Sequence, residues 1–67
     1  MDIRRRVGRN IKKEREARGW SQEELADRAG LHRTYVSGVE RGIRNPTVTV
    51  LERMAQALSL KIGQIAD

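Results

Sequence analysis

The sequence predicts an all-α fold of five short helices, and two observations support this prediction. Apolar residues recur at spacings of three and four residues, which places them along one face of a helix. The segments that carry them are bounded by residues that cap helices and by residues that stop them. No strand is expected, and the 67 residues are expected to form one domain that spans positions 1–67.

The first helix is expected from about Asp2 to Arg18. Ile3, Val7 and Ile11 recur every four residues within it, with Lys and Arg between them, so this helix is amphipathic. Asp2 can cap its start, and Gly19 stops it.

A second helix is expected to begin at Ser21, because Ser21 and Glu24 form a capping box. It ends at Gly30, and its inner face carries Leu25, Ala26 and Ala29. A third helix follows from Arg33 to Arg41, with Gly42 as its stop.

A loop is expected from Ile43 to Pro46, because the residue before a proline is disfavoured in a helix. Thr47 then caps a fourth helix, residues 59–61 form a short turn, and a final short helix follows. The expected inner faces of these last two helices carry Val48, Leu51, Ala55, Leu58, Ile62 and Ile65.

Residues 21–41 have the organisation of a helix-turn-helix, in which a tight turn with a glycine joins two helices. The first helix is residues 21–28, the turn is residues 29–32 and the second helix is residues 33–41. Helices joined so tightly cross steeply, so that the first lies across a groove while the second projects into it.

The outward face of the third helix has the chemistry of a nucleic-acid reader. At about 100° per residue, Val36 and Val39 point inward, and Arg33 and Tyr35 lie on the two shoulders. The outward positions are Thr34, Ser37, Gly38 and Arg41. Hydroxyls, guanidinium groups and a glycine suit base edges and phosphates. A protein interface would instead favour buried aromatic side chains.

The charge of the chain also indicates a polyanionic partner. Fourteen Lys and Arg residues exceed nine Asp and Glu residues, which gives a net charge of +5 and a pI near 10.8. The excess lies in residues 1–18 and in residues 33–44, whereas residues 45–67 are neutral. The alternative interpretation is an arginine-rich surface that is solvated and binds no ligand.

Several function classes are excluded by what the chain lacks. It has no cysteine and one histidine, so neither a disulfide, a zinc site nor a catalytic triad is expected. We expect no enzyme activity, no metal, no cofactor and no small-molecule effector. The short apolar runs predict no contact with a membrane, and we expect a cytoplasmic, nucleoid-associated protein.

The segment GWSQEELADRAGLHRTYVSGVERGIRNPTVTVLERMAQAL resembles the Cro- and lambda-repressor-like family, also called the xenobiotic-response-element family. The resemblance covers about residues 7–66, and SQEELADRAG and ERGIRNP carry most of it. LHRTYVSGVER is further similar to the controller proteins of restriction–modification systems. The resemblance implies a compact five-helix lambda-repressor-like domain that binds an operator, usually as a symmetric dimer.

The resemblance also implies roles for individual residues. The expected base-reading residues are Arg33, Thr34, Ser37 and Arg44, and an arginine can bind guanine O6 and N7 together. The expected contacts to the DNA backbone are Gln22, Tyr35, Arg41 and Asn45. Gln22 would also brace the recognition helix, or it is simply a polar residue at a helix start. Tyr35 would stand on a phosphate, or its ring is half-buried on the shoulder of the domain.

Two positions depart from the family pattern. Gly38 stands where a longer polar side chain is common, so it cannot read a base, although it lets the helix sit deeper in the groove. His32 stands where Ser or Thr commonly caps the recognition helix, so a weaker cap is expected. The family pattern also predicts a partly buried salt bridge between Arg15 and Glu40.

Homodimerisation is expected because a single recognition helix reads too few base pairs to find one site in a genome. The two-fold interface is expected on the neutral C-terminal part of the chain, at Leu60, Ile62 and Ile65. The alternative is that these three side chains close the core of their own domain.

These observations together predict a sequence-specific DNA-binding transcriptional regulator that acts as a homodimer on a two-fold operator, where it blocks polymerase or recruits it. Two alternatives remain open. The chain could be an antitoxin-like or adaptor protein whose main partner is another protein, or a non-specific binder of nucleic acid. Salt dependence separates them, because non-specific binding collapses as salt rises.

Overall fold

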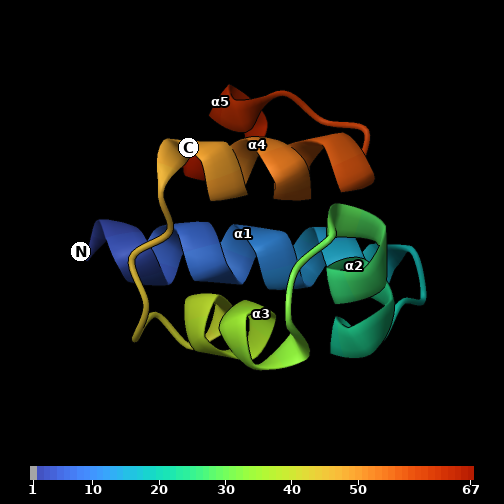
Figure 1. The fold of residues 1–67 in the computed structure, drawn as a ribbon. Coiled ribbons are helices and arrows are strands. Elements are labelled where there is room, and N and C mark those ends of the chain that lie inside the picture. Colours follow the sequence, from blue (N-terminus) through green and yellow to red (C-terminus); the bar gives the residue numbers. More distant parts are fainter. Residues whose placement is uncertain (1) are drawn as a thin grey trace.

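The computed structural model describes residues 2–67. It contains five helices and, within those residues, no strand: α1 (Ile3–Ala17), α2 (Gln22–Ala29), α3 (Arg33–Glu40), α4 (Val48–Ala57) and α5 (Ile62–Ala66). The predicted all-α fold is confirmed. In Figure 1, α1 runs between α3 below and α4 and α5 above, and α2 lies in front of the C-terminal end of α1.

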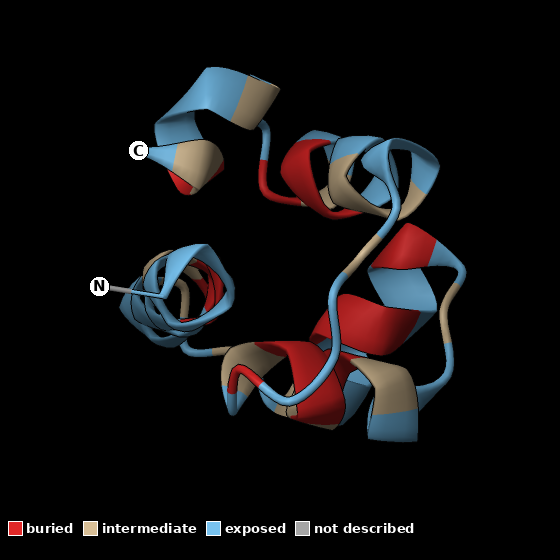
Figure 2. Ribbon diagram, turned by 90° about the vertical axis from the view of Figure 1, so that its left-hand side faces the viewer, coloured by how far each residue is buried: buried red, intermediate tan, exposed pale blue. Residues whose placement is uncertain are grey.

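The helices form a closed ring in which each one packs against two others. Following the contacts, α1 packs on α3, α3 on α2, α2 on α4, α4 on α5, and α5 returns to α1. Figure 2 views this ring nearly end-on, with the buried residues on the sides of the helices that face one another. The order of packing differs from the order along the chain: α2 and α3, and α4 and α5, are neighbours in sequence, whereas the contacts of α1 with α3, of α2 with α4 and of α5 with α1 join helices that are not consecutive.

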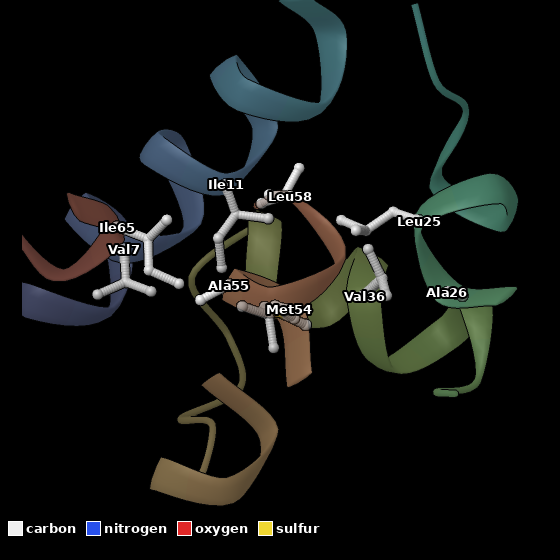
Figure 3. Close-up of a cluster of buried hydrophobic side chains, with 10 residues drawn as sticks. Val7, Ile11, Leu25, Ala26, Val36, Met54, Ala55, Leu58 and Ile65 are labelled. Carbon is white, nitrogen blue, oxygen red and sulfur yellow. The ribbon is translucent and has the colours of Figure 1, made fainter. Parts of the chain in front are cut away.

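The apolar side chains predicted on the inner faces meet at the centre of the ring (Figure 3). Every helix, together with the C-cap of α4, contributes to this cluster, which consists of Val7, Ile11, Leu25, Ala26, Val36, Val39, Met54, Ala55, Leu58 and Ile65. Partly buried side chains, Trp20 and Tyr35 among them, pack around it. Burial of apolar surface of this kind is the main contribution that holds short helices together.

Local capping explains where the helices begin. Asp2 accepts a hydrogen bond from the backbone N–H of Arg4 at 2.9 Å, and the hydroxyl of Ser21 accepts one from Glu24 at 3.0 Å. The hydroxyl of Thr47 accepts one from the N–H of Val50 at 3.2 Å. Each side chain satisfies a backbone donor that the first turn of a helix leaves unpaired.

Ile3 and Val48 do not lie on the inner faces expected for them, and Ile65 lies on its expected inner face but not at the expected dimer interface. Ile3 is 55% exposed and Val48 is 67% exposed, because each is the first residue of its helix and lies before the stretch that neighbouring helices cover. Ile65 is fully buried in the core, so the expectation that it forms a contact between two copies is wrong. Its backbone carbonyl accepts a hydrogen bond from the side chain of Asn10 at 3.0 Å, which fixes α5 on α1.

Gly8 allows α1 and α3 to approach closely. A Cβ atom at this position would meet the backbone carbonyl oxygen of Val39 and would lie 2.7 Å from that of Glu40. Glycine in a helix interior costs about 1 kcal/mol relative to alanine, because it gains no side-chain contact and loses more backbone freedom. The close contact between the two helices explains why the chain has glycine there.

We expect Gly8→Ala to lower the free energy of unfolding, measured by urea denaturation. The new methyl group meets backbone atoms that cannot rotate away, and overpacking of this kind costs about 1–3 kcal/mol, which outweighs the gain of about 1 kcal/mol in helix propensity. Gly63→Ala in α5 is the matched control, because nothing lies within 4 Å of its Cβ position. The explanation fails if Gly8→Ala is as stable as Gly63→Ala.

Candidate nucleic-acid interface

The connection between α2 and α3 is a three-residue turn that fixes the direction of α3. Gly30 ends α2 with φ of +70°, a left-handed conformation that favours glycine. The N–H of Leu31 then donates to the carbonyl of Ala26 at 2.8 Å, and α3 begins at Arg33. The turn thereby sets α3 at an angle to α2, as the helix-turn-helix pattern predicts.

His32 itself caps α3. Its Nδ1 atom accepts a hydrogen bond from the backbone N–H of Thr34 at 3.2 Å, and the hydroxyl of Thr34 lies 2.7 Å from the same nitrogen. An unprotonated ring nitrogen is a hydrogen-bond acceptor and can replace the oxygen of Ser or Thr. The turn places His32 directly before α3, and its imidazole accepts the backbone hydrogen bond that a Ser or Thr side chain more commonly accepts at this position.

The structure brings five of the predicted DNA-contacting residues together. A shallow surface hollow is lined by Gln22, Arg33, Thr34, Ser37 and Arg41. The inner side of the same helix is fully buried at Val36 and Val39. The predicted division of α3 into an apolar inner side and a polar outer side is therefore present.

The arginines of this surface are free to meet anions. Arg33, Arg41 and Arg44 take part in no ion pair among residues 2–67. By contrast, Arg28 on α2 is paired with Glu24 at 2.7 Å. Unpaired guanidinium groups can donate to phosphate oxygens or, in a fork, to guanine.

The start of α1 adds positive charge beside the loop after α3. A Cβ atom on Gly42 would lie 2.8 Å from Cγ of Arg5, so the side chain of Arg5 rests against this loop. The two positive segments of the sequence, residues 1–18 and 33–44, therefore meet at this point. Positive charge from two segments that meet in this way attracts a polyanion.

A buried polar network fixes the end of α3. Nε and Nη2 of Arg15 donate to the two carboxylate oxygens of Glu40 at 2.7 and 3.0 Å, and Nη1 donates to the carbonyl of Trp20 at 2.7 Å. The two side chains are 10% and 2% exposed. The hydrogen bonds from Arg15 to Glu40 raise the pKa of the arginine above its ordinary value. The side chain of Gln22 donates to Glu40 at 3.1 Å, so Gln22 also braces α3.

Tyr35, Arg44 and Asn45 lie outside the hollow. The ring of Tyr35 is partly buried and packs against the core, and the guanidinium of Arg44 lies 5.5 Å from its centroid. Asn45 is exposed in the loop between α3 and α4. Tyr35 thus occupies the half-buried shoulder position that the sequence analysis weighed against a phosphate contact.

Gly38 is the position where reasoning from the helical wheel was wrong. The wheel places it on the outward face, but Gly38 is buried because the side chain of Arg44 lies over it. A wheel treats one helix in isolation, and it cannot anticipate that the following loop folds back. The one sequence feature that bears on this burial is that an arginine, Arg44, follows only two residues after Gly42, the residue expected to end the helix.

Leu60 and Ile62 are partly buried and line an apolar hollow between α4 and α5. Ala55 lies at its floor, and Glu52, Gln56 and Lys61 complete the rim. Ile65, which the sequence analysis grouped with Leu60 and Ile62, is not part of this surface.

Within residues 2–67 no helix is both long enough and apolar enough to cross a membrane. Nor does the described part of the chain hold three or more His, Cys, Asp or Glu side chains in an arrangement that could bind a metal ion.

The ring of helices, the tight turn and the polar face of α3 together define a helix-turn-helix protein. The chain belongs to the helix-turn-helix family, whose pattern matches residues 11–65. This result agrees with the resemblance that the sequence shows, and it makes the chain a DNA-binding transcriptional regulator rather than an enzyme.

Individual relatives support this assignment. An HTH-type transcriptional regulator of Sinorhizobium fredii, y4dJ, is 47% identical over 60 residues, which cover 90% of this chain and 78% of the relative. The crystal structure of the restriction–modification controller protein C.AhdI from Aeromonas hydrophila superposes with a TM-score of 0.90 at 39% identity. That match covers 92% of this chain and 94% of the controller, so the predicted similarity to controller proteins is confirmed.

A further structure shows a protein of this fold on its ligand. SinR, a master regulator for biofilm formation, has been crystallised in complex with DNA. It is similar to this chain with a TM-score of 0.86 and 34% identity, over 91% of this chain and 98% of the SinR chain.

We expect Glu40→Ala to destabilise the fold strongly, because it leaves the Arg15 guanidinium buried without its charged partner. Breaking a buried pair in this way costs about 3–5 kcal/mol. Glu24→Ala, which removes the exposed pair with Arg28, is the matched control and should cost no more than about 1 kcal/mol. Arg33→Ala should leave stability unchanged. Thermal and urea denaturation measure all three variants, and equal midpoints would refute the structural role of Glu40.

Proposed function

We propose that the chain is a sequence-specific regulator that binds a two-fold DNA operator as a homodimer, with α3 in the major groove. The observation that carries the proposal is the outer face of α3, which presents unpaired arginines and hydroxyls but no large aliphatic side chain. Such a face can donate to base edges and to phosphates. We further propose that residues 1–67 form one helix-turn-helix domain and that the protein is cytoplasmic and associated with the nucleoid.

Arg33, Thr34 and Ser37 are assigned to the bases. They lie on the first two turns of α3, and the N-terminal part of a recognition helix is the part that reaches furthest into the groove. Arg33 is exposed and has no carboxylate partner among the described residues, so its guanidinium can take guanine O6 and N7 together. The hydroxyl of Thr34, 2.7 Å from His32 Nδ1, keeps lone pairs that can accept from a base.

Gln22, Arg41 and Asn45 are assigned to the DNA backbone, whereas the half-buried ring of Tyr35 is not. Gln22 is the first residue of α2, where free N–H groups and the helix dipole attract a phosphate. Arg41 lines the same hollow and directly follows the last residue of α3. Contacts to phosphates from α2 and from the end of α3 would fix the position of the recognition helix along the groove.

The dimer follows from the length of α3 and the apolar hollow. Eight residues span about 12 Å of helix, which covers about four base pairs and is too little to specify a site. Two copies that share the surface around Leu60 and Ile62 would present two such helices. A molecule with extents of 28 × 22 × 22 Å is of the right size to space them by one turn of DNA, about 34 Å.

Selection of binding sites from random duplex DNA at about 150 mM salt tests the proposal, since non-specific contacts weaken at that salt concentration. The expected result is a two-fold motif with a guanine in each half-site. Arg33→Ala should lose the preference for that guanine by about 1–3 kcal/mol per half-site. Arg53→Ala on α4, an exposed arginine outside the interface, should select the same motif.

Binding that fades equally on all sequences would refute the proposal. It would favour a non-specific binder or a protein whose main partner is another protein.

The dimer surface is tested by Ile62→Arg, which places a charge in the apolar hollow; because Ile62 is partly buried and packs against the core, the fold of the variant is checked by circular dichroism. We expect a folded monomer in analytical ultracentrifugation, with weaker binding to the selected operator. Ile43→Arg is the control, because Ile43 is 62% exposed in the loop before α4 and should leave the dimer intact. An unchanged dimer in Ile62→Arg would place the interface elsewhere.

A further inference from the structure

Gly38 occupies an unusual place on α3, because its missing side chain leaves room for another residue. A Cβ atom built on Gly38 would lie 2.8 Å from both Cγ and Cδ of Arg44 and 3.1 Å from its Nε. These distances are shorter than van der Waals contact, so the stem of Arg44 fills the space that a side chain at position 38 would need. The conformation of Gly38 is ordinary helix, and its backbone geometry does not require glycine.

The same residue also holds the backbone of the loop. The carbonyl oxygen of Gly38 accepts hydrogen bonds from the N–H groups of Ile43 at 3.1 Å and Arg44 at 3.2 Å. Gly42, with φ of +76°, turns the chain so that these bonds can form. The N–H of Gly42 donates to Val39 at 3.0 Å and completes a Schellman motif. Both the main chain and the side chain of Arg44 therefore rest on one turn of the recognition helix.

The guanidinium group of Arg44 is oriented by an aromatic ring, but no carboxylate neutralises its charge. Its guanidinium lies 5.5 Å from the centroid of the Tyr35 ring, within the range of a cation–π contact. It has no carboxylate partner among residues 2–67. A restrained stem with a free head group loses less side-chain entropy when it binds than a freely rotating arginine does.

We infer that Gly38 and Arg44 form one specificity-determining unit, in which Gly38 is the positioning residue and Arg44 makes the contact with a base. Gly38 has no side chain because Arg44 lies in its place and extends the reading surface beyond the end of α3. This inference rests on the proposed function and on the expected base contact of Arg44, and it adds Gly38 as the residue that positions this arginine.

The inference differs from the idea that a glycine on α3 lets the helix sit deeper in the groove. If Gly38 acted on DNA directly, a methyl group there would weaken binding whether or not Arg44 were present. If Gly38 acts through Arg44, the methyl group matters only while Arg44 is present. A double-mutant cycle separates the two cases.

The experiment compares the unmodified chain with Gly38→Ala, Arg44→Ala and the double variant. Binding is measured to the selected operator and to operators in which each half-site base pair is changed in turn. We expect Gly38→Ala to lower affinity about tenfold, as Arg44→Ala does, and to lose preference at the same base pair. In the Arg44→Ala background the Gly38→Ala change should have no further effect.

Stability provides an independent readout. The methyl group of Gly38→Ala displaces only a flexible side chain, and alanine favours the helix, so the thermal midpoint should stay the same or rise. Gly63→Ala is the matched glycine control and should bind as the unmodified chain does. A merely structural role would lower the midpoint and leave the base preference unchanged.

The inference is overturned if Gly38→Ala binds like the unmodified chain. It is equally overturned if Gly38→Ala weakens binding by the same factor with and without Arg44. Failure of the proposed function looks different, because then the unmodified chain itself selects no sequence. If the chain selects a motif that Arg33→Ala loses and Gly38→Ala keeps, only the role of Gly38 and Arg44 fails.

Discussion

The buried ion pair between Arg15 and Glu40 is the interaction on which the position of the recognition helix depends. Glu40 is the last residue of α3, and its carboxylate is almost completely removed from water. Such a charge is tolerated only when its hydrogen bonds are satisfied. Arg15 from α1 and Gln22 from α2 supply them, and Arg15 also binds the carbonyl of Trp20. One carboxylate therefore joins α1, the α1–α2 connection, α2 and α3.

Gly8 provides the steric counterpart of this pair. It lies on the same side of α1 as Arg15, two helical turns earlier, and it lets the backbone of α1 touch the carbonyl oxygens at the end of α3. Thus α1 meets Glu40 twice, through backbone contact at Gly8 and through the side chain of Arg15. A chain of this size usually needs a disulfide, a metal or a partner to be stable, and this one has no cysteine. The tight α1–α3 contact supplies part of the rigidity that a cross-link would otherwise give.

Most helix boundaries could be predicted from the sequence, because caps and stops act over a few residues. Ser21 and Thr47 cap the helices that they were expected to cap, and Gly30 ends α2. The unexpected burial of Gly38 and Ile65 depends on distant contacts. The burial of Gly38 depends on the loop that follows α3, and that of Ile65 on α1, which lies more than fifty residues earlier. His32 differs in another way, because imidazole is an uncommon capping group and general preferences do not anticipate it.

The sequence of α3 shows why the residues that hold the helix in place differ from those that are proposed to contact DNA. Apart from Arg33 and Glu40, the helix consists of β-branched, aromatic, hydroxyl-bearing and glycine residues, all poor helix formers. A segment of eight such residues would not be helical in water by itself. Its helicity is imposed by Val36 and Val39 in the core, by the cap at His32 and by the network at Glu40. Because these contacts all lie at the ends and on the inner side, the outer residues need not support the helix. Low helix propensity is therefore tolerated at Thr34 and Ser37, which present hydroxyl groups on the outer face, and at Gly38, which leaves space for the side chain of Arg44.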